Sequence, residues 1–95
     1  MAIYIVLTTL NGEGRKGLKE DPSKIKEHNH LIEALGIKIR GQYATLGQFD
    51  FVNIFETEDE AAIYKAAVQL SGRGIHQTIT LPAKSLDDFI KVSAK

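Results

Sequence analysis

Residues 12–17, GEGRKG, are the stretch of this 95-residue chain that most directly suggests chemistry. They fit G-x-G-x-x-G, the pattern of loops that hold the pyrophosphate of a dinucleotide. Such a loop needs a long helix that starts at its third glycine, and an acidic residue about 20 positions later at the end of a parallel strand. Here Pro22 interrupts any helix that starts at Gly17, and no acid ends the strand that begins near Ile37. We therefore predict that residues 12–17 form a flexible connection and bind no nucleotide cofactor.

His28-Asn29-His30 is a second stretch that could suggest chemistry, in this case a metal site. Residues two apart on a helix diverge by about 200°, so the two imidazoles cannot ligate one ion together. Zinc sites on helices space their histidines four apart instead. The chain has no cysteine, which removes thiolate ligands and disulfides. We expect no metal, a partly buried His28 and an exposed His30.

Polar residues at alternate positions of the predicted strands are better candidates for a ligand site. His76 has the parity opposite to Ile75, Ile79 and Leu81, so it points away from the helices if these aliphatic residues share the face that meets them. The same parity places other polar residues on that bare face, beside apolar ones. A concave surface of this composition is typical of small-ligand sites. The polar residues are Tyr4, Thr8, Arg40, Gln42, Asn53 and His76, and their apolar neighbours are Val6, Phe51 and Phe55.

Within this set, the candidate ligand-binding residues are Tyr4, Arg40, Asn53 and His76. A dimer interface is the alternative, because interfaces commonly contain hydrogen-bonded polar residues. A β-bulge in an edge strand would also move every later side chain to the opposite face. No arrangement of serine, histidine and acid and no pair of inward carboxylates is recognisable, so the sequence identifies no catalytic residue.

Four strands and two long helices must position these residues, and a short helix follows them. The strands are runs rich in β-branched and aromatic residues. Asp21-Pro22 predicts the start of the first helix and Gly36 its end. Thr57 and Glu60 fit the capping-box pattern and predict the start of the second helix, and Ser85 is the predicted cap of the short one. The predicted strands are residues 2–10, 37–45, 50–56 and 75–82.

The order of these elements is β-α-β-β-α-β, which predicts an α+β, ferredoxin-like fold with both helices on one face of an antiparallel sheet. Only residues 46–49 separate the second and third strands, so these strands form a hairpin. We expect one domain over residues 1–95. Twelve basic residues balance twelve acidic ones, which disfavours nucleic-acid and membrane partners. Nothing in the chain suggests export, so we expect a cytoplasmic protein.

The bare face of the predicted sheet indicates self-association. It would expose Tyr4, Val6, Phe51 and Phe55 as one apolar patch, and soluble monomers seldom tolerate a large patch of this kind. A twofold axis needs only one self-complementary surface. We therefore expect at least a homodimer.

Residues 43–52, YATLGQFDFV, resemble the hairpin of the GYD domain family. The opening strand AIYIVLTTL, DPSK at the first helix, EDEAA at the second and GRG before the last strand extend the resemblance over nearly the whole chain. The signature Gly-x-Tyr-Asp corresponds here to Gly47, Phe49 and Asp50 around Gln48, with Phe49 in the tyrosine position. The resemblance implies a bacterial or archaeal domain of the dimeric α+β barrel kind with no established activity.

Three hypotheses about function follow. The first is a homodimeric module that binds or senses a small molecule. The second is a small enzyme, similar to the monooxygenases or isomerases among dimeric α+β barrels, which rests on analogy of fold. The third is a purely structural interaction domain. The sequence identifies neither the ligand nor a reaction.

Overall fold

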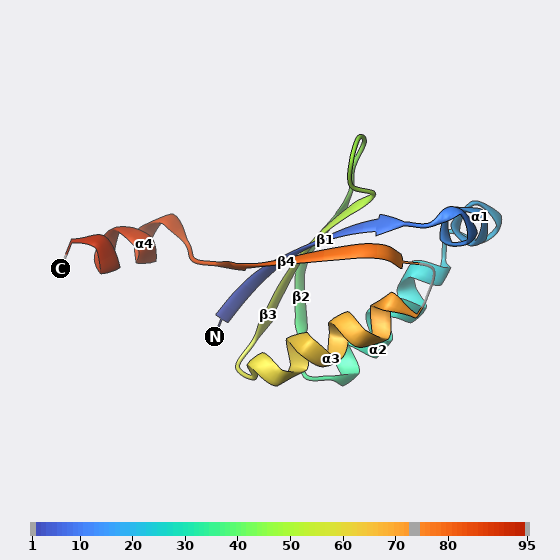
Figure 1. Ribbon diagram of the computed structural model, residues 1–95. Helices are drawn as coiled ribbons and strands as arrows, with labels where there is room; N and C mark the ends of the chain where they lie inside the picture. The colour runs from blue at the N-terminus through green and yellow to red at the C-terminus, as the bar shows by residue number, and fades with distance from the viewer. Residues whose placement is uncertain (1, 73–74, 95) are drawn as a thin grey trace.

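The computed structural model describes residues 2–72 and 75–94, without the side chain of His76. This part of the chain is an α+β protein with one four-stranded antiparallel sheet and four helices, as Figure 1 shows. The strands are β1 (Ala2–Leu10), β2 (Lys38–Ala44), β3 (Phe51–Thr57) and β4 (Ile75–Ala83), and the helices are α1 (Gly12–Glu20), α2 (Lys24–Ala34), α3 (Glu60–Ser71) and α4 (Leu86–Ser93).

The sheet has the strand order β2-β3-β1-β4, so β1 lies in the interior between β3 and β4. All three pairs of neighbouring strands are antiparallel, which confirms the hairpin predicted between β2 and β3. α2 and α3 lie side by side on one side of the sheet (Figure 1). The core forms between that side and the helices. Its buried apolar residues are Val6, Leu10, Ile32, Ile37, Phe55, Ala62, Ile63, Ala66, Leu70 and Ile75.

The burial of Val6 and Phe55 shows that the predicted orientation of the sheet was wrong. Both side chains are almost inaccessible to solvent, beneath the helices, and Phe51 packs against the same core. Strand parity grouped these three residues correctly, but β1 is apolar on both faces, and parity alone does not say which face meets the helices. The bare face instead carries aliphatic residues. They are Ile3, Ile5 and Leu7 of β1, Val52 and Ile54 of β3, and Ile79 and Leu81 of β4.

Two irregularities in the strand pairing account for further corrections. The register of β4 shifts where Leu10 pairs with Ile75, so Ile75 is buried in the core while Ile79 lies opposite Leu7 on the bare face. The prediction that Ile75 shares a face with Ile79 was therefore wrong. The register of β2 shifts between Ile39 and Gly41 in the same way. Each shift changes which face the following residues occupy.

The glycine-rich residues 12–17 belong to helix α1, so the predicted flexible connection was wrong. The Asn11 side chain caps this helix, because its Oδ1 accepts a hydrogen bond of 2.7 Å from the Gly14 N–H. Pro22 does separate α1 from α2, as expected. Asp21 does not cap α2, however, because its carboxylate accepts hydrogen bonds from the backbone N–H and the hydroxyl of Ser23 instead.

The signals at Gly36 and Ser85 predicted the helix ends correctly, but the N-cap of α3 differs from the prediction. Gly36 follows α2 with a φ of 88°, the left-handed conformation expected there. Asp59 caps α3 in place of Thr57, and its carboxylate accepts a bond from the Ala61 N–H. Ser85 caps α4 as predicted, because its Oγ accepts a hydrogen bond of 3.1 Å from the Asp88 N–H.

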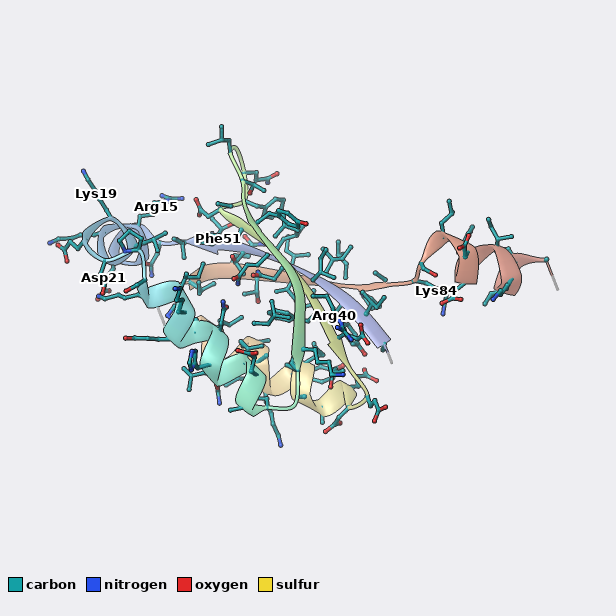
Figure 2. The ribbon with its side chains drawn as sticks, turned by 180° about the vertical axis from the view of Figure 1, so that it is seen from behind. Arg15, Lys19, Asp21, Arg40, Phe51 and Lys84 are labelled. Carbon is teal, nitrogen blue, oxygen red and sulfur yellow. The ribbon has the colours of Figure 1, made fainter. Side chains whose placement is uncertain are left out.

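α4 projects beyond the sheet as an arm (Figure 1), and the whole molecule measures 51 × 29 × 18 Å. Figure 2 shows Arg15, Lys19 and Asp21 gathered at the α1 end and Lys84 at the opposite end, where the chain leaves the sheet for α4. In residues 2–72 and 75–94, no helix has the length and apolar character needed to cross a membrane.

Candidate functional site

A cavity of about 570 Å³ lies between the sheet and the first two helices. Its floor includes Thr8 and Asn53, which are polar residues buried on the helix-facing side of β1 and β3. Its charged lining residues Glu13, Lys16, Glu20 and Lys24 are exposed, so they lie at the mouth. Apolar side chains complete the walls. They include Leu10, Leu18, Ile25, Ile32, Phe51 and Phe55.

A chain of three carboxamides lines this cavity and joins the sheet to α2. Asn53 Nδ2 donates to the backbone oxygen of Val6 at 3.0 Å, and Asn53 Oδ1 accepts from Gln42 Nε2 at 2.8 Å. Gln42 and Asn29 then form a reciprocal pair, in which each amide donates to the other at 2.9 Å. The network therefore joins β1, β3, β2 and α2.

The direction of every bond in this network follows from the Val6 carbonyl. A backbone oxygen can only accept, so the Asn53 NH₂ group must point toward it. The Asn53 oxygen then faces Gln42, which must present its NH₂ group there. The Gln42 oxygen is left to accept from Asn29. Amides that are all hydrogen-bonded in this way favour a single arrangement of the side chains. Any other arrangement would leave an amide unpaired, which is costly in a site of low dielectric constant.

Sequence parity predicted part of this cluster. Thr8, Gln42 and Asn53 do share a face, and all three line the cavity. Asn29 was not among the predicted site residues. Its spacing of four from Ile25 and three from Ile32 places it within the buried stripe of α2, and that signal could have identified it. His28 is half-buried and lines the cavity, and His30 is exposed, as expected.

The other candidate residues lie elsewhere. Tyr4 packs against the core and lines a separate, smaller hollow near Pro82 and Ser85. The side chain of His76 lies outside the described residues. Arg40 is exposed, and its Nε lies 2.8 Å from Glu56 Oε2. The structure therefore brings Asn53 together with Thr8 and Gln42, but not with Tyr4 or Arg40.

Arg40 and Glu56 form a two-pronged ion pair between neighbouring strands. The second contact joins Arg40 Nη2 to Glu56 Oε1 at 3.3 Å. The hydrogen bond from the guanidinium holds the pKa of Glu56 below its ordinary value, and the same bond raises the pKa of Arg40. Surface pairs of this kind contribute little to stability, so we assign Arg40 a local role in pairing β2 with β3.

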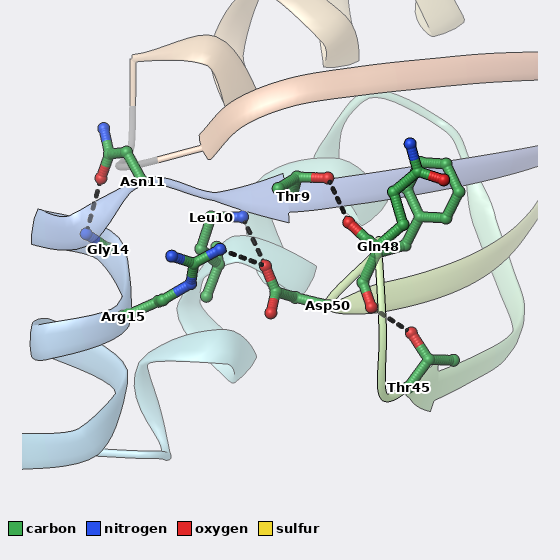
Figure 3. Close-up of polar contacts among 9 residues, drawn as sticks. Thr9, Leu10, Asn11, Gly14, Arg15, Thr45, Gln48 and Asp50 are labelled. Atoms are coloured by element: carbon green, nitrogen blue, oxygen red, sulfur yellow. Dashed lines mark hydrogen bonds and ion pairs between the residues drawn. The ribbon is translucent and has the colours of Figure 1, made fainter.

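The hairpin motif Gly47, Phe49 and Asp50 adopts a tight turn beside the end of β1 (Figure 3). Gly47 has a φ of 105°, which favours glycine because a Cβ would be strained there. The backbone oxygen of Phe49 accepts a hydrogen bond of 2.6 Å from the Thr45 hydroxyl. Asp50 Oδ2 accepts a bond of 2.7 Å from the Leu10 N–H. These contacts explain the motif as a structural one.

Asp50 also connects the hairpin to α1. Its Oδ2 lies 3.7 Å from Arg15 Nη2, and its backbone N–H donates to Thr8 O at 2.8 Å (Figure 3). The aspartate thus joins the hairpin, the end of β1 and the helix that borders the cavity. Across the part of the chain that the structure describes, no cluster of three or more histidine, cysteine, aspartate or glutamate residues could hold a metal ion.

The antiparallel sheet, its one covered face and the Gly47–Asp50 turn define a small α+β domain of the kind that the sequence resembles. Residues 4–92 match the model of the GYD domain, and the chain belongs to this family. This confirms the family predicted from the hairpin.

A curated relative and several solved structures are similar to this chain. The relative, a glutamine synthetase and cystathionine beta-lyase binding protein of Thermus thermophilus, is 42% identical over 91 residues, which are 95% of this chain and 96% of the relative. A crystal structure of a protein from Thermus thermophilus has a TM-score of 0.59 at 22% identity, covering 90% of this chain and 95% of the other. The C-terminal domain of MgtC from Mycobacterium tuberculosis has a TM-score of 0.60 at 12% identity, covering 87% and 88%. The two structures show likeness of fold alone.

The contacts of Asp50 predict a graded effect on stability. Asp50→Ala leaves the part-buried Leu10 N–H without its acceptor and should lower the free energy of unfolding by about 1–3 kcal/mol. Asp50→Asn keeps an acceptor oxygen and should cost less. Arg15→Ala removes only an exposed partner and should change stability by about 0.5 kcal/mol or less. Urea denaturation of the three variants checks this order, and equal losses in all three would contradict it.

Proposed function

We propose that this protein is a homodimeric module that binds a small molecule in the cavity beneath α1 and α2. The carboxamide network at the cavity floor is the observation that carries the proposal. In this view each chain is a ferredoxin-like domain, and two copies pair through the bare faces of their sheets as a dimeric α+β barrel. The strand order β2-β3-β1-β4 and the two helices on one side support that arrangement.

The composition of the cavity supports a ligand of small-molecule size. Its volume of about 570 Å³ falls within the range of about 300–1,000 Å³ that is usual for such sites. Apolar walls and a few converging polar groups are also usual. A core that served packing alone would gain more from apolar residues at Gln42 and Asn53, because buried amides contribute little net stability even when they are bonded.

The bare face of the sheet supports the dimer. Ile5 lies between Ile54 and Leu81 in one cross-strand row, and Leu7 lies between Val52 and Ile79 in the next. These rows form a contiguous aliphatic surface with no helix over it in residues 2–72 and 75–94. Burying apolar surface contributes about 25 cal/mol per Å², and a standard interface buries about 800 Å² on each partner. A second copy presents a complementary aliphatic face.

The dimer predicts a single substitution that separates the copies. Ile5→Lys places a charge at the centre of the bare face, so the variant should sediment as a folded monomer at micromolar concentration, whereas the native protein sediments at twice that mass. Val68→Lys is the matched control, because Val68 is 73% exposed on α3, away from this face, and the control should remain dimeric. A monomeric native protein would contradict the dimer.

The cavity predicts a second pair of variants, both in the glycine-rich helix α1. A Cβ at Gly17 would lie 3.6 Å from Lys24 Nζ at the cavity mouth, so Gly17→Leu should obstruct entry. A Cβ at Gly12 meets no atom within 4 Å, and Gly12→Leu is the control. In ligand-observed NMR with a fragment library, fragments that bind the native protein should also bind the control and not Gly17→Leu. If the fragments bind Gly17→Leu as well as they bind the native protein, or if no fragment binds at all, the cavity is not the binding site.

A second candidate function is the binding of metabolic enzymes. It comes from the curated relative, whose name describes a protein that binds glutamine synthetase and cystathionine beta-lyase. The arm α4 is a suitable surface for such a partner. Leu86, Phe89 and Ile90 lie three and four positions apart along one side of this helix and are 71%, 56% and 54% exposed. An exposed amphipathic helix of this kind can dock in an apolar groove of another protein.

This candidate function is tested with purified glutamine synthetase from the organism that encodes this protein. The native protein should bind the immobilised enzyme, and Phe89→Asp should weaken binding by about tenfold or more, because truncating or charging an apolar anchor typically costs over 1 kcal/mol. Leu46→Asp is the control, because Leu46 is fully exposed in the hairpin between β2 and β3, and Figure 1 shows this hairpin far from α4. If the native protein does not bind the enzyme, the candidate is wrong for this partner.

A further inference from the structure

The pair between Gln42 and Asn29 indicates which chemical class of ligand the cavity recognises. Because Asn53 takes one N–H of Gln42, the amide of Gln42 meets Asn29 with one donor and one acceptor side by side. The group that fits this edge is another amide in the orientation that Asn29 supplies. Both contacts measure 2.9 Å, so the fit is good on each side.

We propose that the cavity binds neutral molecules that carry a primary amide, or the cyclic amide edge of a heterocycle, on a small apolar body. The ligand's amide replaces the Asn29 side chain on Gln42. This inference rests on the proposed function, since it assigns a ligand class to the same cavity.

The charges around the cavity support a neutral ligand. The polar residues buried at its floor are Thr8 and Asn53, which are neutral, and the half-buried Gln42 beside them is also neutral. Glu13, Lys16, Glu20 and Lys24 are exposed at the mouth, in water, and the half-buried His28 lines the cavity from α2. An ionic group at the floor would therefore lose its hydration without gaining a partner of opposite charge, which is strongly unfavourable.

The hydrogen-bonding pattern of Gln42 excludes charged analogues for a second reason. A carboxylate offers only acceptors, so it would set its oxygen against the Gln42 Oε1 atom. An amidinium offers only donors, so it would leave the Gln42 N–H without an acceptor. Of the amide, the carboxylate and the amidinium, only the amide satisfies both halves of the edge. The apolar body of the ligand would then contact the walls formed by Ile25, Ile32 and Phe51.

Asn29 is the side chain of the network that a ligand can displace. It projects from α2, whereas Gln42 and Asn53 belong to paired strands and Asn53 is fixed by the Val6 carbonyl. The hydrogen bonds of Asn29 in this network go to Gln42 alone. Removing the Asn29 amide should thus free the recognition edge without disturbing the bond from Asn53 to β1.

Benzamide, benzoate and benzamidine test the inference, because they share one shape and differ in charge and in hydrogen-bonding pattern. Calorimetric titration at pH 7 should show benzamide binding the native protein at least about tenfold more tightly than the other two, the factor that corresponds to one unsatisfied hydrogen bond. Asn29→Ala should bind benzamide more tightly than the native protein does, by a similar factor. His30→Ala, an exposed change on the same helix, is the control and should bind like the native protein.

Gln42→Glu provides an exchange of specificity. The new carboxylate accepts at both oxygens, so the variant should lose benzamide and gain benzamidine. Equal binding of the three compounds, a preference of the native protein for benzoate, or weaker benzamide binding in Asn29→Ala would overturn the ligand class. If none of the three binds while unrelated fragments still enter the cavity, the ligand class is wrong and the proposed function stands. If no fragment binds either, both are wrong. The comparison of Asn29→Ala with the native protein decides the matter even if Gln42→Glu fails to fold.

Discussion

Strand β1 is apolar on both faces, and a single layer of helices can cover only one of them. Val6 and Leu10 face the helices and are buried, while Ile5 and Leu7 face the other way. The neighbouring strands β3 and β4 also have one covered face and one bare face, because paired residues share a face. The core, the position of the cavity and the bare aliphatic face therefore all depend on which side of β1 the helices occupy.

Polar residues on the covered side then have to be satisfied inside the protein. Asn53 lies opposite Val6 in the pairing of β1 with β3, and Gln42 lies opposite Asn53 in the pairing of β2 with β3. This places the two amides side by side, with Asn53 buried and Gln42 half-buried, where an unpaired amide would be costly. Asn29 meets them from α2. The resulting network links the helix layer to three strands through hydrogen bonds, beside a space that apolar packing leaves open.

The hairpin that identifies the family holds the end of β1 and helix α1 in place next to the cavity. Asp50 accepts a bond from the Leu10 N–H, at the point where β1 ends and its pairing with β4 shifts. Arg15 brings α1 toward the same carboxylate. Aspartate residues in motifs are often catalytic. The contacts of Asp50 instead explain its presence structurally, because it satisfies a backbone N–H and anchors a helix. The phenylalanine in the tyrosine position of the motif fits this account, because the Phe49 contact is made by its backbone oxygen.

The sequence by itself determined the four strands, the helices α2, α3 and α4, the hairpin and the family, because these depend on signals within a few residues, such as Gly36 after α2 and Ser85 before α4. It did not predict helix α1, whose glycine-rich residues indicated a flexible connection. It did group Thr8, Gln42 and Asn53 on one face. Only the tertiary structure decided which face that was, since parity is relative and both sides of β1 are apolar. The shifts at Leu10 and in β2 reversed the faces of later residues, and pairing across the sheet controls such shifts. The contact of Asn29 with Gln42 also required tertiary structure, because it joins a helix to a strand across the cavity.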